Sequence, residues 1–189
     1  MRVNNSNPDL QQAMHERFGL VERLMAHVRV EVEPANIKRL LFALGALVRG
    51  HAANARAFVH NAGVQLLETL FHHERSTPDI RRRCVTFVTD LATDGQLHGA
   101  DVLGHIDPEQ WCNPLGTLLR EPHIASIEKA LDATDALQPQ CTSLQPSIAA
   151  ALAHLESELA AVRAGGESTD HIDEVRARAA LLQLSQPVS

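Results

Sequence analysis

Three observations on the sequence predict an all-α fold built from stacked helical units. Hydrophobic residues make up 44% of the 189 residues, aromatic residues make up only 3%, and Tyr is absent. This composition favours an aliphatic, helical core over a β-sandwich. Apolar residues also recur at helical spacing, and the helical stripes themselves recur along the chain. A length of 189 residues suits one domain with a real core.

The long-range recurrence is the most informative feature of the sequence. Each stripe has apolar residues at positions i, i+3 and i+6, which share one helix face. The stripes are Leu41, Leu44 and Leu47; Val85, Val88 and Leu91; and Leu131, Thr134 and Leu137. Spacing in the low forties, with three helices to a unit, is typical of armadillo repeats. We therefore expect an armadillo/HEAT-like, right-handed superhelical solenoid of about three repeats plus a C-terminal helix.

The expected helices follow from local start signals and from the apolar period. Pro34 and Pro78 suit a first helical turn, and Asp79 adds favourable negative charge near a helix start. Gly19 and Gly63 each precede an apolar helix opening. The helices are expected near Pro8–Val30, Pro34–Gly50, Asn54–Asn61, Gly63–His73, Pro78–Thr93, Glu109–Arg120, His123–Leu137, Pro146–Ala164 and Asp170–Leu184.

Glycines supply the expected breaks. Gly50 closes one helix, and the segment Thr93–Pro108 is expected to be an irregular insertion. The pair Gly165 and Gly166, followed by polar residues, is typical of a hinge. We therefore expect a repeat domain over residues 8–164, followed over residues 165–189 by a hinge, a short C-terminal helix and a frayed tail.

Charge and hydropathy exclude several classes of function. With 17 Lys and Arg against 23 Asp and Glu, the net charge of −6 gives no field for binding a nucleic-acid backbone. The longest apolar stretch, Leu40–Val48, is far shorter than the roughly 20 residues needed to cross a bilayer. The opening MRVNNSNPDL does not resemble a secretory signal, so the chain would be cytosolic if the sequence is complete. We expect a monomer without nucleic-acid or membrane partners.

Catalytic and metal chemistry are not expected. Eleven His residues are present, but His72 and His73 are adjacent and therefore point about 100° apart on a helix, and no HExxH or HxxxH pattern occurs. The acids Asp90 and Asp94 have no nucleophile placed beside them in the sequence. The sequence thus predicts neither an enzyme nor a cofactor, and it favours structural or surface roles for the His side chains.

Three further features leave alternatives open. The triplet Arg81–Arg83 is either a solvated helix face or a contact for acidic groups on another protein. Trp111, the only Trp, is expected to anchor the core, with a binding platform as the alternative. Cys112 and Cys141 could face each other and form a disulfide, or they could remain buried thiols.

Particular strings resemble a known family. The stretch KRLLFALGALVRGHAANARAFVHNAGVQLLETL, from Lys38 to Leu70, resembles the armadillo-type nucleotide exchange factors of the seventy-kilodalton heat-shock chaperones. DIRRRCVTFVTDLAT and QWCNPLGTLLREPHIASIEKALDATDAL are similar to the endoplasmic-reticulum members that serve the chaperone BiP. The similarity covers about Met14 to Val162. Relative to those members, the N-terminal part is expected to be missing.

The resemblance implies a function without bond-making chemistry. A curved rod would grip one lobe of the ATPase domain of a BiP-type chaperone, open its nucleotide cleft and release ADP, without a cofactor, in the endoplasmic-reticulum lumen. In such rods one helix of each unit lines the concave face. Here the resemblance implies that exposed positions on two helices contact the partner: Arg23, His27, Gln65, Glu68, Thr69 and His72. The alternatives are a scaffold for another partner or an inactive, truncated isoform.

Overall fold

Every regular element in the described residues is a helix. The computed structural model describes residues 19–98, 102–137, 144–166 and 168–185, and no strand occurs within these ranges. The prediction of an all-α, armadillo-like fold class is therefore confirmed at the level of secondary structure. The chain packs as two compact units, Met1–Asp107 and Pro108–Ser189.

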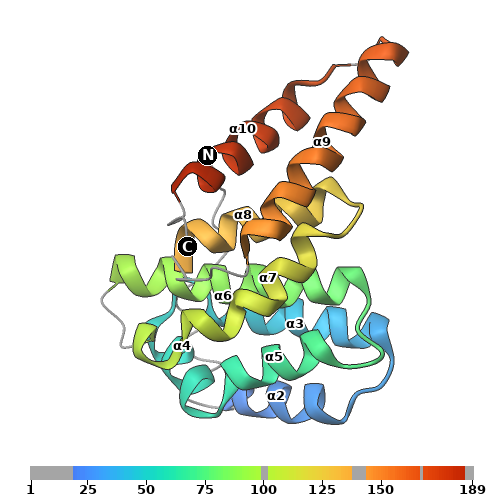
Figure 1. Ribbon diagram of the computed structural model, residues 1–189. Helices are drawn as coiled ribbons and strands as arrows, with labels where there is room; N and C mark the ends of the chain where they lie inside the picture. The colour runs from blue at the N-terminus through green and yellow to red at the C-terminus, as the bar shows by residue number, and fades with distance from the viewer. Residues whose placement is uncertain (1–18, 99–101, 138–143, 167, 186–189) are drawn as a thin grey trace. The chain divides into compact units, whose positions relative to one another are not determined.

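Five α-helices and one short 3-10 helix make up the described part of the first unit. They are α2 (Leu20–Val30), α3 (Pro34–Val48), α4 (Ala52–His60), α5 (Gly63–His72), α6 (Pro78–His98) and η1 (Leu103–His105). Helix α3 packs against α2 and α6, and α5 packs against α6. The short helix α4 contacts α2, α3, α5 and α6. Figure 1 shows α5 in front of α3.

The second unit ends in a long helical hairpin. Its elements are η2 (Pro108–Trp111), α7 (Cys112–Leu119), α8 (Ile124–Leu137), α9 (Gln145–Gly165) and α10 (Asp170–Ser185). Helix α7 packs on α8 and α9, while α10 packs on α9 and α8. Gly166, with a φ of 76°, ends α9 in the left-handed conformation that Gly adopts without strain. This glycine stands where the hinge was predicted.

The repeated stripes lie in the core, with one exception. Leu41, Leu44 and all of the second and third stripes are buried, and the Thr134 hydroxyl donates to the Ala130 carbonyl at 2.8 Å. Leu47, however, is half-buried, and Val48 takes the core position. The prediction for Leu47 is wrong. Val48, seven residues after Leu41, lies nearly two full turns on and therefore points closer to the direction of Leu41, while the same i+6 spacing still buries Leu91 and Leu137. The difference depends on which neighbouring helix covers each face.

One element is longer than predicted. Helix α6 continues to His98, so the expected irregular segment from residue 93 is wrong over its first six residues. The buried face that includes Leu91 and Ala92 continues past Thr93 to Gly95, so packing also stabilises this part of the helix. A Cβ on Gly95 would lie 3.3 Å from Leu103, so the absence of a side chain there lets η1 pack closely.

The predicted N-terminal segment, the domain boundaries and the repeat arrangement are not all covered by the described helices. The predicted continuous helix Pro8–Val30 is wrong at Gly19, whose left-handed φ of 51° places it before the first turn of α2. The first part of that predicted helix, residues 8–18, and the tail over 186–189 lie outside the described residues. The boundaries 8–164 and 165–189, the number of repeats and their superhelical arrangement stay predictions. Among the described helices, none is both long and apolar enough to serve as a membrane span.

Candidate partner-binding surfaces

The residues expected to contact a partner lie on helices α2 and α5. Five of the six are exposed and Glu68 is half-buried. Val64, Leu67 and Leu70 on the opposite side of α5 are buried, as the helical period predicts. We call this set the α2–α5 surface: Arg23, His27, Gln65, Glu68, Thr69 and His72.

Local contacts orient part of the α2–α5 surface. The Thr69 hydroxyl donates to the Gln65 carbonyl at 2.8 Å, so this hydroxyl is already engaged within its own helix. The His72 ring packs edge-on against Phe71, with ring centroids 5.2 Å apart. Arg29 donates to the Asn61 carbonyl at 2.7 Å, which ties α2 to the turn before α5. The structure therefore exposes the predicted residues, and their role in binding stays a prediction.

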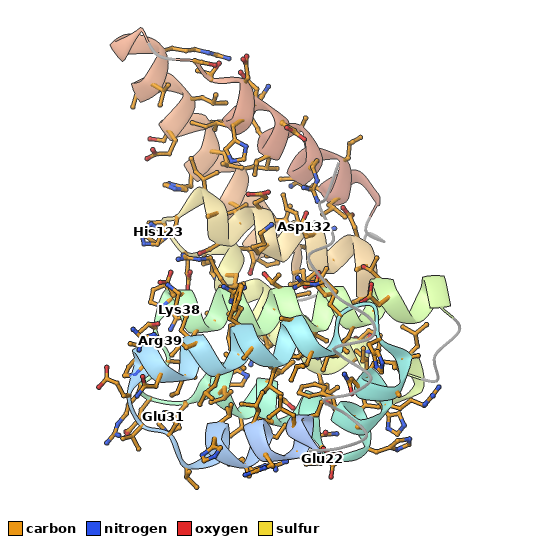
Figure 2. The ribbon with its side chains drawn as sticks, turned by 180° about the vertical axis from the view of Figure 1, so that it is seen from behind. Glu22, Glu31, Lys38, Arg39, His123 and Asp132 are labelled. Atoms are coloured by element: carbon orange, nitrogen blue, oxygen red, sulfur yellow. The ribbon has the colours of Figure 1, made fainter. Side chains whose placement is uncertain are left out.

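A second surface, which the sequence did not predict, joins α3 to α6. Lys38 pairs with Asp79 at 2.6 Å, and Arg49 Nε donates to Asp90 at 3.0 Å. The Arg83 guanidinium lies over the Phe42 ring, 5.2 Å from its centroid. We call these three contacts the α3–α6 ladder. Figure 2 shows Lys38 and Arg39 together on α3, seen from behind.

A constant register explains the α3–α6 ladder. Each contact joins a residue of α3, or Arg49 at its C-terminal cap, to the residue 41 positions later on α6, since 79 − 38, 83 − 42 and 90 − 49 are all 41. A constant offset requires two helices that run parallel with little relative slip. Beyond this series, the Asp94 carboxylate accepts from the Gly50 N–H at 2.7 Å, at an offset of 44 residues.

The structure also decides how the arginine triplet is used. All three side chains are half-buried. Arg81 donates to the Ser76 carbonyl at 2.8 Å, Arg82 pairs with Asp79, and Arg83 covers Phe42. The expectation of a simply solvated face is therefore wrong, because each guanidinium has a contact within the first unit. Opposite charges repeated 41 residues apart were the signal that sequence reasoning missed.

The ion pairs shift the titration of this surface. The hydrogen bond from Lys38 lowers the pKa of Asp79 below its usual value; burial opposes this effect, and the charges of Lys38 and Arg82 add to it. Backbone N–H groups of Glu33 and Val32 lower the pKa of Glu31 in the turn before α3. Both carboxylates therefore remain charged under mildly acidic conditions.

The only Trp and Cys84 are buried and lie outside both surfaces. Trp111 is 1% exposed and confirms the predicted core anchor. Burial raises the pKa of the Cys84 thiol to about 12. Cys112 begins α7, but Cys141 lies outside the described residues, so their pairing stays a prediction. Within the described ranges, no group of three or more His, Cys, Asp or Glu side chains could hold a metal ion.

The described residues form packed helices that display charged and aromatic side chains, as helical repeat proteins do. The family model described as "SIL1/FES1/HPBP1 C-terminal domain" matches residues 3–103, which is more than half of the chain. The chain belongs to this family. The match lies within the first unit, which carries both surfaces.

Two curated relatives extend the comparison. The chain is 25% identical over 154 residues to "Nucleotide exchange factor SIL1" of Xenopus laevis, covering 72% of this chain and 33% of the relative. It is 29% identical over 115 residues to "Protein SERAC1" of Danio rerio, covering 52% of this chain and 16% of the relative. The chain thus spans a third or less of each relative. No solved structure matches.

Proposed function

We propose that this protein is a nucleotide exchange factor for a seventy-kilodalton heat-shock chaperone. The observation that carries the proposal is its membership of the SIL1/FES1/HPBP1 family. Similarity to a relative named as a nucleotide exchange factor supports the same function. The activity needs no catalytic group on this chain, because exchange changes only the affinity of the partner for its nucleotide.

The finer proposal names the partner, the compartment and the step. The partner is the ATPase domain of a BiP-type chaperone in the endoplasmic-reticulum lumen, and the promoted step is ADP release. The similarity of residues 110–137 to the members that serve BiP supports this choice, as does the SIL1 relative. The protein acts as a monomer, without a cofactor and without catalysing a covalent reaction.

Differential affinity provides the mechanism. If the helical scaffold binds the open arrangement of the ATPase lobes more tightly than the closed one, it must weaken ADP binding by the same factor. A coupling of about 1.4 kcal/mol corresponds to a tenfold change in affinity. The α2–α5 surface is the first candidate for the contact, because its polar side chains are exposed on two helices of the matched unit.

The test measures release of fluorescent ADP from a BiP-type ATPase domain after mixing with excess unlabelled nucleotide. We expect the full chain to accelerate release at least tenfold at saturation, with an acceleration that depends on its concentration. Leu44→Asp, which should not fold, is the matched negative control. An unchanged release rate at concentrations where wild-type protein binds the ATPase domain contradicts the exchange function.

A helical scaffold for another partner is the second candidate. It is favoured by the similarity to SERAC1, a relative whose name specifies no exchange activity. Absence of any binding to the ATPase domain, with the chain folded, would favour this candidate. An inactive, truncated isoform would instead bind without accelerating release.

A further inference from the structure

Phe42 is exposed where other aromatic side chains are buried. It is 62% exposed, whereas Phe58, Phe71, Phe87 and Trp111 are all in the core of the described residues. Burying a side chain of this size is worth about 1.5–3 kcal/mol, so leaving it in water forgoes stability. An exposed aromatic ring on an otherwise regular helix is typical of an anchor for a partner.

Two guanidinium groups flank this ring without a carboxylate to neutralise them. Arg83 covers one face of Phe42, and Arg39 lies one helical turn before it. Arg39 donates only a long, 3.4 Å hydrogen bond to the neutral Asn36 side chain. In the described part of the chain, neither Arg39 nor Arg83 forms an ion pair. We call Phe42, Arg39 and Arg83 the Phe42 site.

Ion pairs of α3 and α6 flank the Phe42 site on both sides. On one side Lys38 and Arg82 share Asp79, and on the other Arg49 pairs with Asp90. These ion pairs hold α3 and α6 in register on both sides of the ring, and Arg39 and Arg83 add positive charge beside it. This local charge is opposite in sign to the net charge of −6 on the whole chain.

We propose that the Phe42 site binds an acidic protein surface that has an apolar recess at its centre. Phe42 fills the recess, while Arg39 and Arg83 pair with carboxylates around it, in the forked geometry that guanidinium groups favour. The occupant is such a surface on the ATPase domain of the chaperone, so this inference rests on the proposed function. It places the contact on the Phe42 site in place of the α2–α5 surface, and it adds the chemistry of the partner surface.

The test measures the dissociation constant of the full chain for a BiP-type ATPase domain, in parallel with ADP release. Phe42→Ala should weaken binding at least tenfold, as truncation of a central anchor does. The double variant Arg39→Glu/Arg83→Glu should weaken it by a similar factor. Its binding should also lose most of the salt dependence seen in the wild type, whereas Phe42→Ala should keep that dependence.

Two matched variants serve as controls. Leu181→Ala truncates an apolar side chain that is 67% exposed on α10, and Arg56→Glu reverses the charge of an exposed Arg on α4. Both should bind within twofold of wild type, and circular dichroism should show that every variant is folded.

The pattern of results separates the two proposals. If wild type accelerates ADP release but the Phe42-site variants bind like the controls, the site is wrong and the exchange function stands. Loss of binding only on changing Arg23 or Glu68 would overturn the site in favour of the α2–α5 surface. If wild-type protein does not bind the ATPase domain, the exchange function fails, and the proposed occupant of the site fails with it.

Discussion

At the scale of single residues, Gly19 and Gly63 both stand at the start of a helix, but glycine is required there for different physical reasons. Gly19 caps α2 with a φ of 51°, a conformation that costs other residues about 1–2 kcal/mol. Gly63 begins α5, but the left-handed residue there is the preceding Ala62, with a φ of 60°. A Cβ on Gly63 would lie 2.5 Å from the Phe58 ring. Gly19 is therefore required by backbone conformation and Gly63 by packing.

Gly63→Ala should lower the free energy of unfolding by about 1–3 kcal/mol, because the added methyl overpacks a core ring that also stacks on Phe87. Ala62→Gly should have the opposite effect and add up to about 1 kcal/mol, since it relieves the left-handed strain. Urea unfolding followed by circular dichroism measures both. Equal stability of the two variants would contradict this distinction.

Cys84 offers a test of burial at one atom. Its thiol faces the core of the first unit and its pKa is raised to about 12, so it should be almost entirely protonated at about pH 8. Iodoacetamide should leave Cys84 unmodified in the native protein and alkylate it in urea, with peptide mapping to identify the site. Rapid alkylation of Cys84 in the native protein would show that the helix face of α6 that carries Cys84 is not buried.

At the scale of elements, helix pairing converts the apolar period into a core. Asn54 illustrates how the pairing is completed, because its buried side chain donates to the Leu47 carbonyl at 2.8 Å and joins α4 to the end of α3. The His51 ring caps α4 by accepting from the Asn54 N–H at 3.2 Å. Polar contacts therefore set how α4 meets α3, while apolar contacts supply most of the stabilisation.

Leu44→Asp tests the buried face of α3. Leu44 is fully buried, so an unpaired carboxylate there should cost about 4 kcal/mol or more and unfold the unit. Glu68→Arg on α5 should instead keep the wild-type melting temperature, because this side chain is only half-buried, while changing partner affinity if the α2–α5 surface binds. Wild-type melting temperatures for both variants would overturn the assignment of the core face.

At the scale of the whole molecule, carboxylates with lowered pKa values occur in both units. Asp79 lies in the first, and Asp132 and Asp173 lie in the second. Burial raises the pKa of Asp132, but hydrogen bonds and charges from Lys129 and Arg178 lower it by more. For Asp173, the hydrogen bond from Thr169 is the largest cause of the lowered pKa.

These shifts predict acid sensitivity. A carboxylate whose pKa is lower in the folded state binds fewer protons there than when unfolded, so acidification favours unfolding. Stability should be fully present near neutral pH and should fall progressively below about pH 5. Urea midpoints measured at intervals from neutral pH down to about pH 3 test this. A urea midpoint that rises on acidification would contradict the prediction that these carboxylates stabilise the folded state.

Asp132→Asn isolates one contribution to this effect. It should lower stability at neutral pH by about 1 kcal/mol, because it removes a charged partner of Lys129 and Arg178. The loss of stability between about pH 5 and pH 3 should then be smaller than in wild type. Glu156→Gln, which removes a charge from an exposed position on α9, is the matched control.

The helical class, most helix positions, the buried stripes and the family could be predicted from the sequence. Each depends on local periodicity or on strings of neighbouring residues, which are properties of the chain itself. The extension of α6 and the half-burial of Leu47 could not be predicted, because both depend on how far a neighbouring helix covers the face. The exposure of five of the six α2–α5 residues followed from the helical period. The α3–α6 ladder was not predicted, although its opposite charges 41 residues apart are visible in the sequence.

The sequence by itself determined that this protein is helical, which residues can share a helix face, and to which family it belongs. Only the tertiary structure decided that α3 and α6 run parallel at an offset of 41 residues, and hence that Arg83 lies over Phe42. Phe42 belongs to the longest apolar stretch, yet it is exposed. Periodicity gives the angle of a side chain around its own helix, but burial depends on which neighbouring helix packs against that angle.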